Sequence, residues 1–217
     1  LDIYKGEILS LLGENGSGKT TLMNMLSGIY FPDEGQIFIN GKEEVIRSPK
    51  DAFDLGIGMV HQHFMQAEML TVLENVIAGA EPSAKGKIKY AKARRGVQEM
   101  IDRFSFDINL DSKIEDLSVG ERQRVEILKV LYRGGKILIF DEPTRGIDVG
   151  ARAEIYGLLE KLRADGKSII LISSETEEIQ GTCDRTIVMR SGHVTGELNA
   201  EEMKDTKLML QYMYKDV

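Results

Sequence analysis

The chain has little of several features that would assign it to other protein classes. It has one cysteine, Cys183, among 217 residues, so it can form neither an internal disulfide nor a cysteine metal cluster, which fits a reducing cytosol. No apolar run approaches the roughly 20 residues of a membrane-spanning helix. No basic and apolar leader with a small-residue cleavage site is present at the start. These absences predict a soluble, cytosolic chain.

Basic residues are also in short supply. Lys and Arg number 28 against 35 Asp and Glu, which gives a formal net charge of -7. Non-specific binding to nucleic acid needs clustered basic side chains that replace phosphate counterions. The charge balance therefore argues against a nucleic-acid partner, and the length allows one composite domain with a substantial core.

What the chain does contain is a series of short apolar runs of strand-like length. Several are continuous rather than alternating in polarity, as expected of strands buried on both faces, and helical stretches separate the last three. This pattern predicts an α/β fold built on a sheet. Residues 1–4 are interpreted as the end of a further strand. The six runs are 8–12, 36–39, 57–60, 137–140, 169–172 and 187–189.

The pattern changes between the third and fourth runs. Polar and apolar residues at helical spacing fill about 67–135, with 81–89 interpreted as a loop, and they predict a helical insertion. We therefore expect a single domain over residues 1–217. Its core would occupy about 1–66 and 136–198, and a C-terminal helix would occupy about 199–217.

A glycine-rich segment follows the first apolar run directly. Residues 13–20 fit the pattern G-x-x-x-x-G-K-[ST], and helical sequence continues to Ser27. Such a loop can curl its backbone N–H groups around a β-phosphate, while Lys19 reaches the β- and γ-oxygens and Thr20 ligates Mg²⁺. The segment predicts a site for ATP and Mg²⁺. The expected nucleotide-binding residues are Gly13, Glu14, Asn15, Gly16, Ser17, Gly18, Lys19, Thr20 and Thr21.

Two carboxylates, Asp141 and Glu142, end a buried strand. Acids in such a place need cations or water. In a phosphate-loop protein Asp141 would hold Mg²⁺, and Glu142 would orient and polarise the attacking water as general base. The dipeptide alone is equally compatible with two solvated acids at an ordinary strand end.

Ser118 and Gly120 precede a helical stretch at 125–131. A small hydroxyl and a glycine at a helix N-terminus suit an anion site. Because Glu121 follows Ser118 by three residues, the same pattern is also a capping box, which needs no ligand. Both interpretations stay open on this segment alone.

The order of these segments resembles the ABC ATPase family: the phosphate loop, then Gln62, then the segment at 117–123, then the acidic strand. The resemblance covers essentially the whole chain and implies a P-loop NTPase core of ABC ATPase type with a helical insertion subdomain. It implies that Ser118 and Gly120 bind the γ-phosphate held by a second subunit of a head-to-tail homo- or heterodimer. Asp148 would lie at the dimer seam, and Gln62 would contact Mg²⁺ or water and sense a transmembrane partner.

Two parts of the chain resemble different halves of the tandem ATPase subunits found in one subfamily. Residues 58–64, together with Glu74 and Asn75, look like the first ATPase half of the tandem subunits that energise simple-sugar and nucleoside importers. Residues 144–151 and 172–175 look like the second half. The resemblance therefore implies an importer ATPase with a mosaic sequence.

The chain departs from the family pattern in two places. Most members carry a histidine just after the strand that is 169–172 here, where this chain has Ser174; a hydroxyl does not titrate near neutral pH, so slow hydrolysis is expected. The family's adenine-stacking aromatic lies further upstream than Tyr4, which is interpreted as a strand packing residue. Three histidines are interpreted as loop residues: His61, His63 and His193.

The implied function is that of an ATP-hydrolysing importer subunit that powers uptake of a sugar or nucleoside through a membrane permease. We expect peripheral attachment at the cytoplasmic face of the cell membrane. One alternative is a hydrolysis-impaired, truncated or recombined ABC ATPase fragment. Another is a soluble ABC ATPase acting on the ribosome or DNA, a class that usually carries a coiled coil or basic linker. The expected catalytic residues are Lys19, Gln62, Glu142 and Ser174, and the expected metal ligands are Thr20, Gln62 and Asp141.

Overall fold

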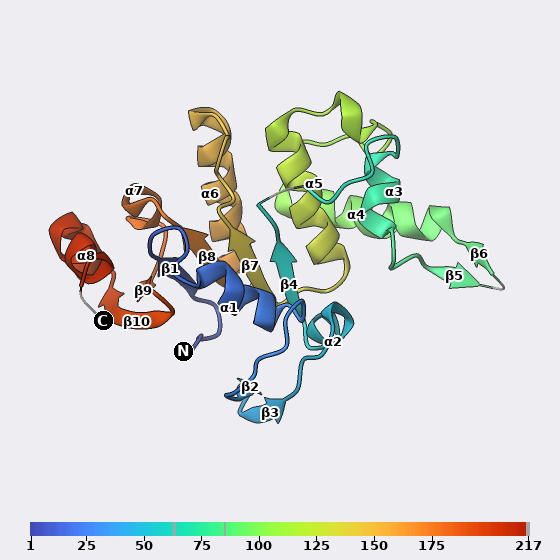
Figure 1. The fold of residues 1–217 in the computed structure, drawn as a ribbon. Coiled ribbons are helices and arrows are strands. Elements are labelled where there is room, and N and C mark those ends of the chain that lie inside the picture. Colours follow the sequence, from blue (N-terminus) through green and yellow to red (C-terminus); the bar gives the residue numbers. More distant parts are fainter. Residues whose placement is uncertain (63, 85, 216–217) are drawn as a thin grey trace.

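A computed structural model describes residues 1–62, 64–84 and 86–215. Its centre is a six-stranded sheet with the order β10-β9-β1-β8-β7-β4 (Figure 1). The strands from β9 to β4 are parallel to their neighbours, and β10 pairs antiparallel with β9 at the edge. The α/β prediction is therefore confirmed. The strands are β1 (Ile8–Leu12), β4 (Ile57–Val60), β7 (Ile137–Asp141), β8 (Ser168–Ser173), β9 (Arg185–Arg190) and β10 (His193–Asn199).

Helices cover both faces of this sheet, because each central strand sends alternate side chains to opposite sides. Ile8 and Leu12 of β1 belong to a buried cluster that includes α5 (Val119–Tyr132) and α6 (Val149–Ala164). Leu9 and Leu11 belong to the cluster on the other face, with α1 (Lys19–Leu26) and α2 (Pro49–Asp54). Figure 1 shows the two helical layers on either side of the strands.

The chain between β4 and β7 forms a helical unit. It contains α3 (Val72–Ile77), α4 (Tyr90–Phe104), the short 3-10 helix η1 (Ile114–Asp116) and α5. The α4 sequence forms one apolar stripe, because its buried residues recur at helical spacing and face α5 and α3. Those residues are Ala93, Val97, Ile101 and Phe104.

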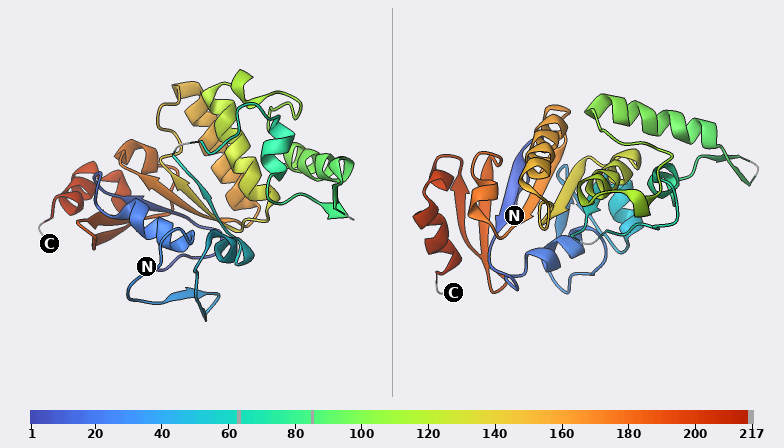
Figure 2. Two further views of the ribbon diagram at one scale, coloured as in Figure 1. Left: turned by 45° about the vertical axis from the view of Figure 1, so that its right-hand side comes forward. Right: turned by 90° about the horizontal axis from the view of Figure 1, so that it is seen from above.

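The helical unit and the C-terminal elements occupy opposite ends of the molecule. Figure 2 shows α4 at one end and α8 (Thr206–Met213), which follows the 3-10 helix η2 (Glu202–Lys204), at the other. Among the described residues, no helix combines the length and apolar character needed to cross a bilayer.

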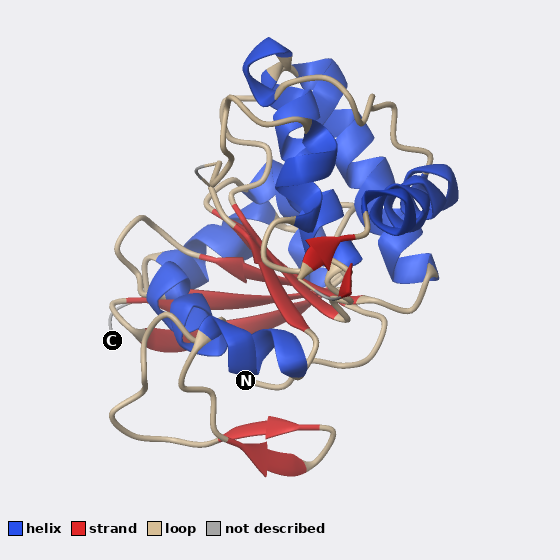
Figure 3. Ribbon diagram, turned by 90° about the vertical axis from the view of Figure 1, so that its right-hand side faces the viewer, coloured by secondary structure: helices blue, strands red, loops and turns tan. Residues whose placement is uncertain are grey.

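Three segments differ from the sequence predictions. Residues 1–4 form no strand. The run at 36–39 does form β2 (Ile37–Ile39), but it pairs with β3 (Lys42–Glu44) in a hairpin apart from the main sheet, as Figure 3 shows. The expected loop at 81–89 contains a small hairpin, β5 (Ser83–Ala84) with β6 (Lys87–Ile88). Strands β5 and β6 are too short to show hydrophobic periodicity, so the sequence pattern could not predict them.

The last third of the chain also differs. The helix between β8 and β9, α7 (Thr176–Ile179), has only four residues. Strand β10 was not predicted because it is an edge strand with mostly polar, partly exposed residues and a register shift between Val194 and Gly196. The terminal helix α8 is shorter than the expected 199–217, since β10 continues to Asn199.

Candidate functional site

The loop at 13–20 joins β1 to α1 and depends on its glycines. Gly16 and Gly18 have φ values of 84° and 101°, in the region that favours glycine. Gly13 is required for a different reason, because a Cβ there would lie 2.2 Å from the carbonyl oxygen of Met189 and 2.7 Å from Ser17 Oγ. The loop therefore lies directly against β9, and its start cannot accept a side chain without moving.

Lys19 is buried at the start of α1 and faces back into the loop. Its Nζ donates to the carbonyl oxygens of Gly13, at 2.6 Å, and Glu14, at 3.0 Å. Burial lowers the pKa of this ammonium, while the charges of Glu142 and Asp141 oppose that shift. The loop thus holds a partly desolvated ammonium beside two carboxylates.

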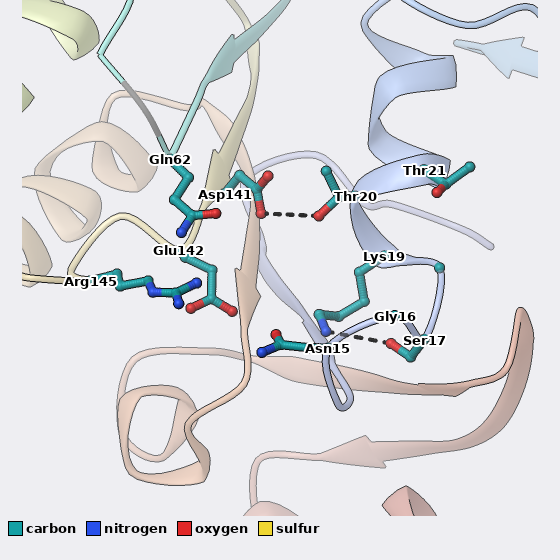
Figure 4. Close-up of a pocket in the computed structure, with 11 residues that line it drawn as sticks. Asn15, Gly16, Ser17, Lys19, Thr20, Thr21, Gln62, Asp141, Glu142 and Arg145 are labelled. Carbon is teal, nitrogen blue, oxygen red and sulfur yellow. Dashed lines mark hydrogen bonds between the residues drawn. The ribbon is translucent and has the colours of Figure 1, made fainter.

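A hollow of about 150 Å³ opens beside this loop. In Figure 4 Lys19 and Thr20 reach it from α1, while Gln62 and the acidic pair reach it from the opposite side. The sheet explains this meeting, because β1, β7 and β4 are parallel and their carboxyl ends share one edge. The lining residues are Asn15, Gly16, Ser17, Gly18, Lys19, Thr20, Thr21, Gln62, Asp141, Glu142 and Arg145.

Thr20 and Asp141 meet inside the hollow. The Thr20 hydroxyl lies 3.5 Å from Asp141 Oδ1, which is long for an O–H···O bond, and Asp141 is only 5% exposed. Mg²⁺ prefers a few protein oxygens and takes its other ligands from water and phosphate. The hydroxyl, the carboxylate and the Gln62 amide oxygen fit that preference. Within the described ranges, no cluster of three or more His, Cys, Asp and Glu is placed to hold a metal.

Glu142 has an unusual backbone. Its φ of 49° is in the left-handed region that non-glycine residues rarely adopt. Its N–H donates to the Ile172 carbonyl of β8 at 3.0 Å, and its own carbonyl accepts from the Arg145 N–H at 3.1 Å. The turn therefore directs the Glu142 side chain into the hollow (Figure 4). Such strain is often found at functional sites.

Arg145 is a residue of the hollow that the sequence prediction missed. It is exposed and lies in the turn that begins at Glu142. Its cationic side chain adds a second positive group to the hollow besides Lys19. The available signal was its position three residues after the acidic pair, in the same strand-end turn.

His61 and Gln62 directly follow β4. Because β4 pairs with β7, Gln62 emerges beside Asp141. Burial lowers the pKa of the half-buried His61, and the charges of Glu126 and Asp141 oppose this shift. The loop interpretation is wrong for His193, which is the first residue of β10. His63 lies outside the described residues.

Ser118, Gly120 and Asp148 lie outside the hollow. Ser118 is the N-cap of α5 and forms the capping box, with its Oγ 3.3 Å from the Glu121 N–H. Asp148 is the N-cap of α6, where its Oδ1 accepts from the Ala151 N–H at 3.0 Å. A Cβ on Gly120 would lie 3.4 Å from Ala151 Cβ, so the two helix starts are neighbours. The three residues thus lie together outside the hollow, with Ser118 and Asp148 exposed and Gly120 partly exposed.

Ser174 and Tyr4 are also placed apart from the hollow's lining. Ser174 is half-buried just past the end of β8, the strand beside β7. The packing prediction for Tyr4 is wrong: its side chain is 59% exposed, and the Arg185 guanidinium lies 4.7 Å from its ring centroid. The predicted residues that do meet are residues 15–21 of the phosphate loop and α1, Gln62, Asp141 and Glu142. Gly13 and Glu14 belong to the same loop but do not line the hollow.

Comparisons with known proteins show which family this chain is related to. A family model described as ABC transporter matches residues 1–145. The nucleoside import ATP-binding protein NupA of Lactococcus lactis subsp. cremoris (strain MG1363) is 48% identical over 192 residues, which cover 88% of this chain and 38% of that protein. The guanosine import ATP-binding protein NupO of Bacillus subtilis (strain 168) is 47% identical over 208 residues, with coverages of 96% and 41%. The chain spans about two fifths of the length of these relatives.

The fold is also shared with solved structures. The dimeric post-hydrolysis structure of the ATP-binding cassette MJ0796, bound to ADP and Pi, superposes with a TM-score of 0.77 at 28% identity. That superposition covers 92% of this chain and 88% of the cassette. The family resemblance inferred from four ordered motifs is thereby confirmed. The chain belongs to the ABC transporter family and has the P-loop α/β fold of its ATP-binding cassettes.

Proposed function

We propose that this chain binds ATP with Mg²⁺ and hydrolyses it as the ATP-binding part of an importer. One observation carries the proposal: Thr20 and Asp141, far apart in sequence, lie 3.5 Å apart beside the buried Lys19. An ammonium, a helix start and paired oxygen ligands together suit a triphosphate with its metal.

The proposed roles follow from where each group lies. The amides of 13–20 and the start of α1 hold the phosphates, and Lys19 neutralises their charge. Thr20, Gln62 and Asp141 would hold Mg²⁺, which supplies charge neutralisation at the phosphate oxygens when bound. Glu142 acts as general base toward the attacking water, from the strained turn that directs it into the hollow.

We propose that a second ATPase subunit completes the site. Ser118 and Gly120 lie at the exposed start of α5, where the first-turn amides can bind an anion, yet they do not line the hollow of their own chain. A head-to-tail homo- or heterodimer would place them on the partner's γ-phosphate, with Asp148 at the seam. The solved MJ0796 cassette is dimeric, which supports this arrangement.

The transport role rests on the relatives. NupA and NupO are named as import ATP-binding proteins for nucleoside and guanosine. We therefore propose that this chain energises a permease for a sugar or nucleoside from the cytoplasmic face of the membrane. The division into a core and a helical insertion at about 67–135 belongs to the same proposal.

Binding and turnover measurements test the nucleotide site. ATP binding, followed with a fluorescent analogue, should require Mg²⁺ and fall at least about tenfold in Lys19→Ala, because a charged phosphate contact is lost. Glu142→Gln should keep binding but lose about a hundredfold or more in turnover, the range expected for a general base. Binding that is unaffected by Lys19→Ala would exclude the proposed site.

A hydrolysis-impaired ATPase is the second candidate. It is favoured by Ser174, whose hydroxyl stands where most family members have histidine. If the missing imidazole limits turnover, Ser174→His should raise the ATP turnover of the assembled transporter without changing ATP affinity. Unchanged turnover would show that Ser174 does not limit hydrolysis.

A further inference from the structure

Glu178 is a buried carboxylate outside the lining of the hollow, and it has no role in the proposed chemistry. Glu178 of α7 is 6% exposed, and its two oxygens accept hydrogen bonds from two hydroxyls. Thr144 Oγ1 donates to Oε1 and Ser173 Oγ donates to Oε2. Both donors are themselves buried. Burying a carboxylate is costly unless it is hydrogen-bonded, and charge-assisted bonds of this kind are strong.

The phenol of Tyr156 belongs to the same cluster. Burial raises its pKa to about 12, and the charge of Glu178 acts in the same direction. Tyr156 lies on α6, so the cluster joins α7, α6, the end of β8 and the turn after β7. A network that draws on four elements constrains their relative positions more than any single bond does.

The two hydroxyls belong to the segments that flank the reacting groups. Thr144 follows Glu142 by two residues, and Ser173 directly precedes Ser174. The Glu142 N–H is bonded to the carbonyl of Ile172, so the two segments already lie side by side. The Glu178 carboxylate is therefore hydrogen-bonded to both segments, to one through each of its oxygens.

We propose that Glu178 is a positioning residue that fixes the end of β7 against the end of β8 and so holds Glu142 in its strained conformation. A left-handed backbone at a glutamate persists only where surrounding contacts determine it. The bond to Thr144 restrains the turn two residues beyond Glu142. The bond to Ser173 restrains the strand to which the Glu142 backbone is bonded. This inference rests on the proposed role of Glu142 as general base.

Glu178→Gln is the sharpest perturbation, because it keeps the size of the side chain and removes one acceptor. An amide offers one oxygen and one NH₂, so one of the two hydroxyls loses its acceptor. We expect turnover to fall about tenfold while the KM for ATP changes less than about twofold, the pattern of a displaced reacting group. Glu177→Gln is the matched control, since the adjacent Glu177 is exposed and the charge change is identical.

Thr144→Val and Ser173→Ala test the same link without touching the carboxylate. Each removes one hydroxyl, and each should lower turnover in a way that is not additive with Glu178→Gln, because the residues share one network. These variants also keep the test decisive if Glu178→Gln does not fold. Additive effects, or a turnover loss matched by the loss of folded protein, would overturn the proposal.

Hydrogen exchange separates this proposal from the proposed ATPase activity. In the 217-residue chain, Glu178→Gln should speed amide exchange in peptides covering 141–147 and 172–176, while Glu177→Gln should not. If the wild-type chain shows no Lys19-dependent turnover, the ATPase proposal fails, yet the exchange result still decides whether Glu178 holds these segments. Unchanged exchange in Glu178→Gln would overturn the positioning role.

Discussion

Gly58 of β4 packs directly against Val130 of α5, and Gly58→Ala should disrupt this packing. A Cβ on Gly58 would lie 2.1 Å from Val130 Cγ1, whereas carbon atoms in contact prefer about 3.5–4.0 Å. One side must therefore move by about 1.5 Å. Val130 is 4% exposed and cannot turn into solvent, so either its side chain adopts another rotamer within the packed core or the helix shifts.

Overpacking of this kind typically costs about 1–3 kcal/mol. For a chain of this size each 1 kcal/mol lowers Tm by about 2–4 °C, so Gly58→Ala should lower Tm by about 5 °C in thermal unfolding. Because β4 leads to Gln62 and α5 begins next to Ser118, ATP turnover should fall as well. Gly157→Ala is the control, since its Cβ meets nothing within 4 Å in an exposed helix position, and it should stabilise the chain by up to about 1 kcal/mol.

A double-mutant cycle makes the test specific. Val130→Ala alone should destabilise by about 1–2 kcal/mol through the space it leaves. Combined with Gly58→Ala it should cost less than the sum of the two single changes by about 1 kcal/mol or more, because the new methyl group occupies part of that space. Strictly additive costs, or a neutral Gly58→Ala, would refute the reasoning from this contact.

Three further predictions concern single side chains. Ser118→Ala should cost about 1 kcal/mol of unfolding free energy through the lost cap. Ser118→Asp should keep the cap, but its negative charge would repel a γ-phosphate, so ATP-dependent dimerisation measured by sedimentation should be lost. Dimers of Ser118→Asp would argue against a γ-phosphate contact. Burial lowers the pKa of His61 below 6.5 in the folded state, so at lower pH the unfolded state binds more protons than the folded state. The free energy of unfolding should therefore fall as pH drops below about 6.5. His61→Gln should flatten that dependence in urea unfolding followed across pH, and an unchanged slope would contradict it. Burial raises the pKa of Cys183 to about 12, so a thiol reagent should modify it at pH 8 only in denaturant, and rapid native labelling would disprove this.

Much of the site could be predicted because its motifs are contiguous. The loop at 13–20 forms from glycines between a buried strand and a helix, and all of that information is local. The acidic pair is likewise indicated by an apolar strand that ends in two carboxylates. Ser118 illustrates the limit: the capping box and the anion site predict the same local geometry, so the capping box that the structure shows is compatible with both.

Other features depended on neighbours that the pattern does not encode. Arg145 reaches the hollow only because the turn after Glu142 returns toward it. Strand β10 was missed because its edge position lets polar residues form a strand. Tyr4 was misplaced because residues 1–4 form no strand, and its exposed ring lies beside the Arg185 guanidinium of β9.

The sequence by itself determined the phosphate loop, because that motif consists of residues close together along the chain. It also determined the family and the α/β class, through the order of the motifs and of the apolar runs. The motifs predicted that Thr20 and Asp141, 121 residues apart, hold one metal ion, but only the tertiary structure gives the 3.5 Å distance between their side-chain oxygens. It also decided that one carboxylate, Glu178, joins the segments after β7 and β8. The order of the strands brings Thr20 close to Asp141 and the segment after β7 close to the segment after β8. That order depends on packing across the whole sheet, which local periodicity does not specify.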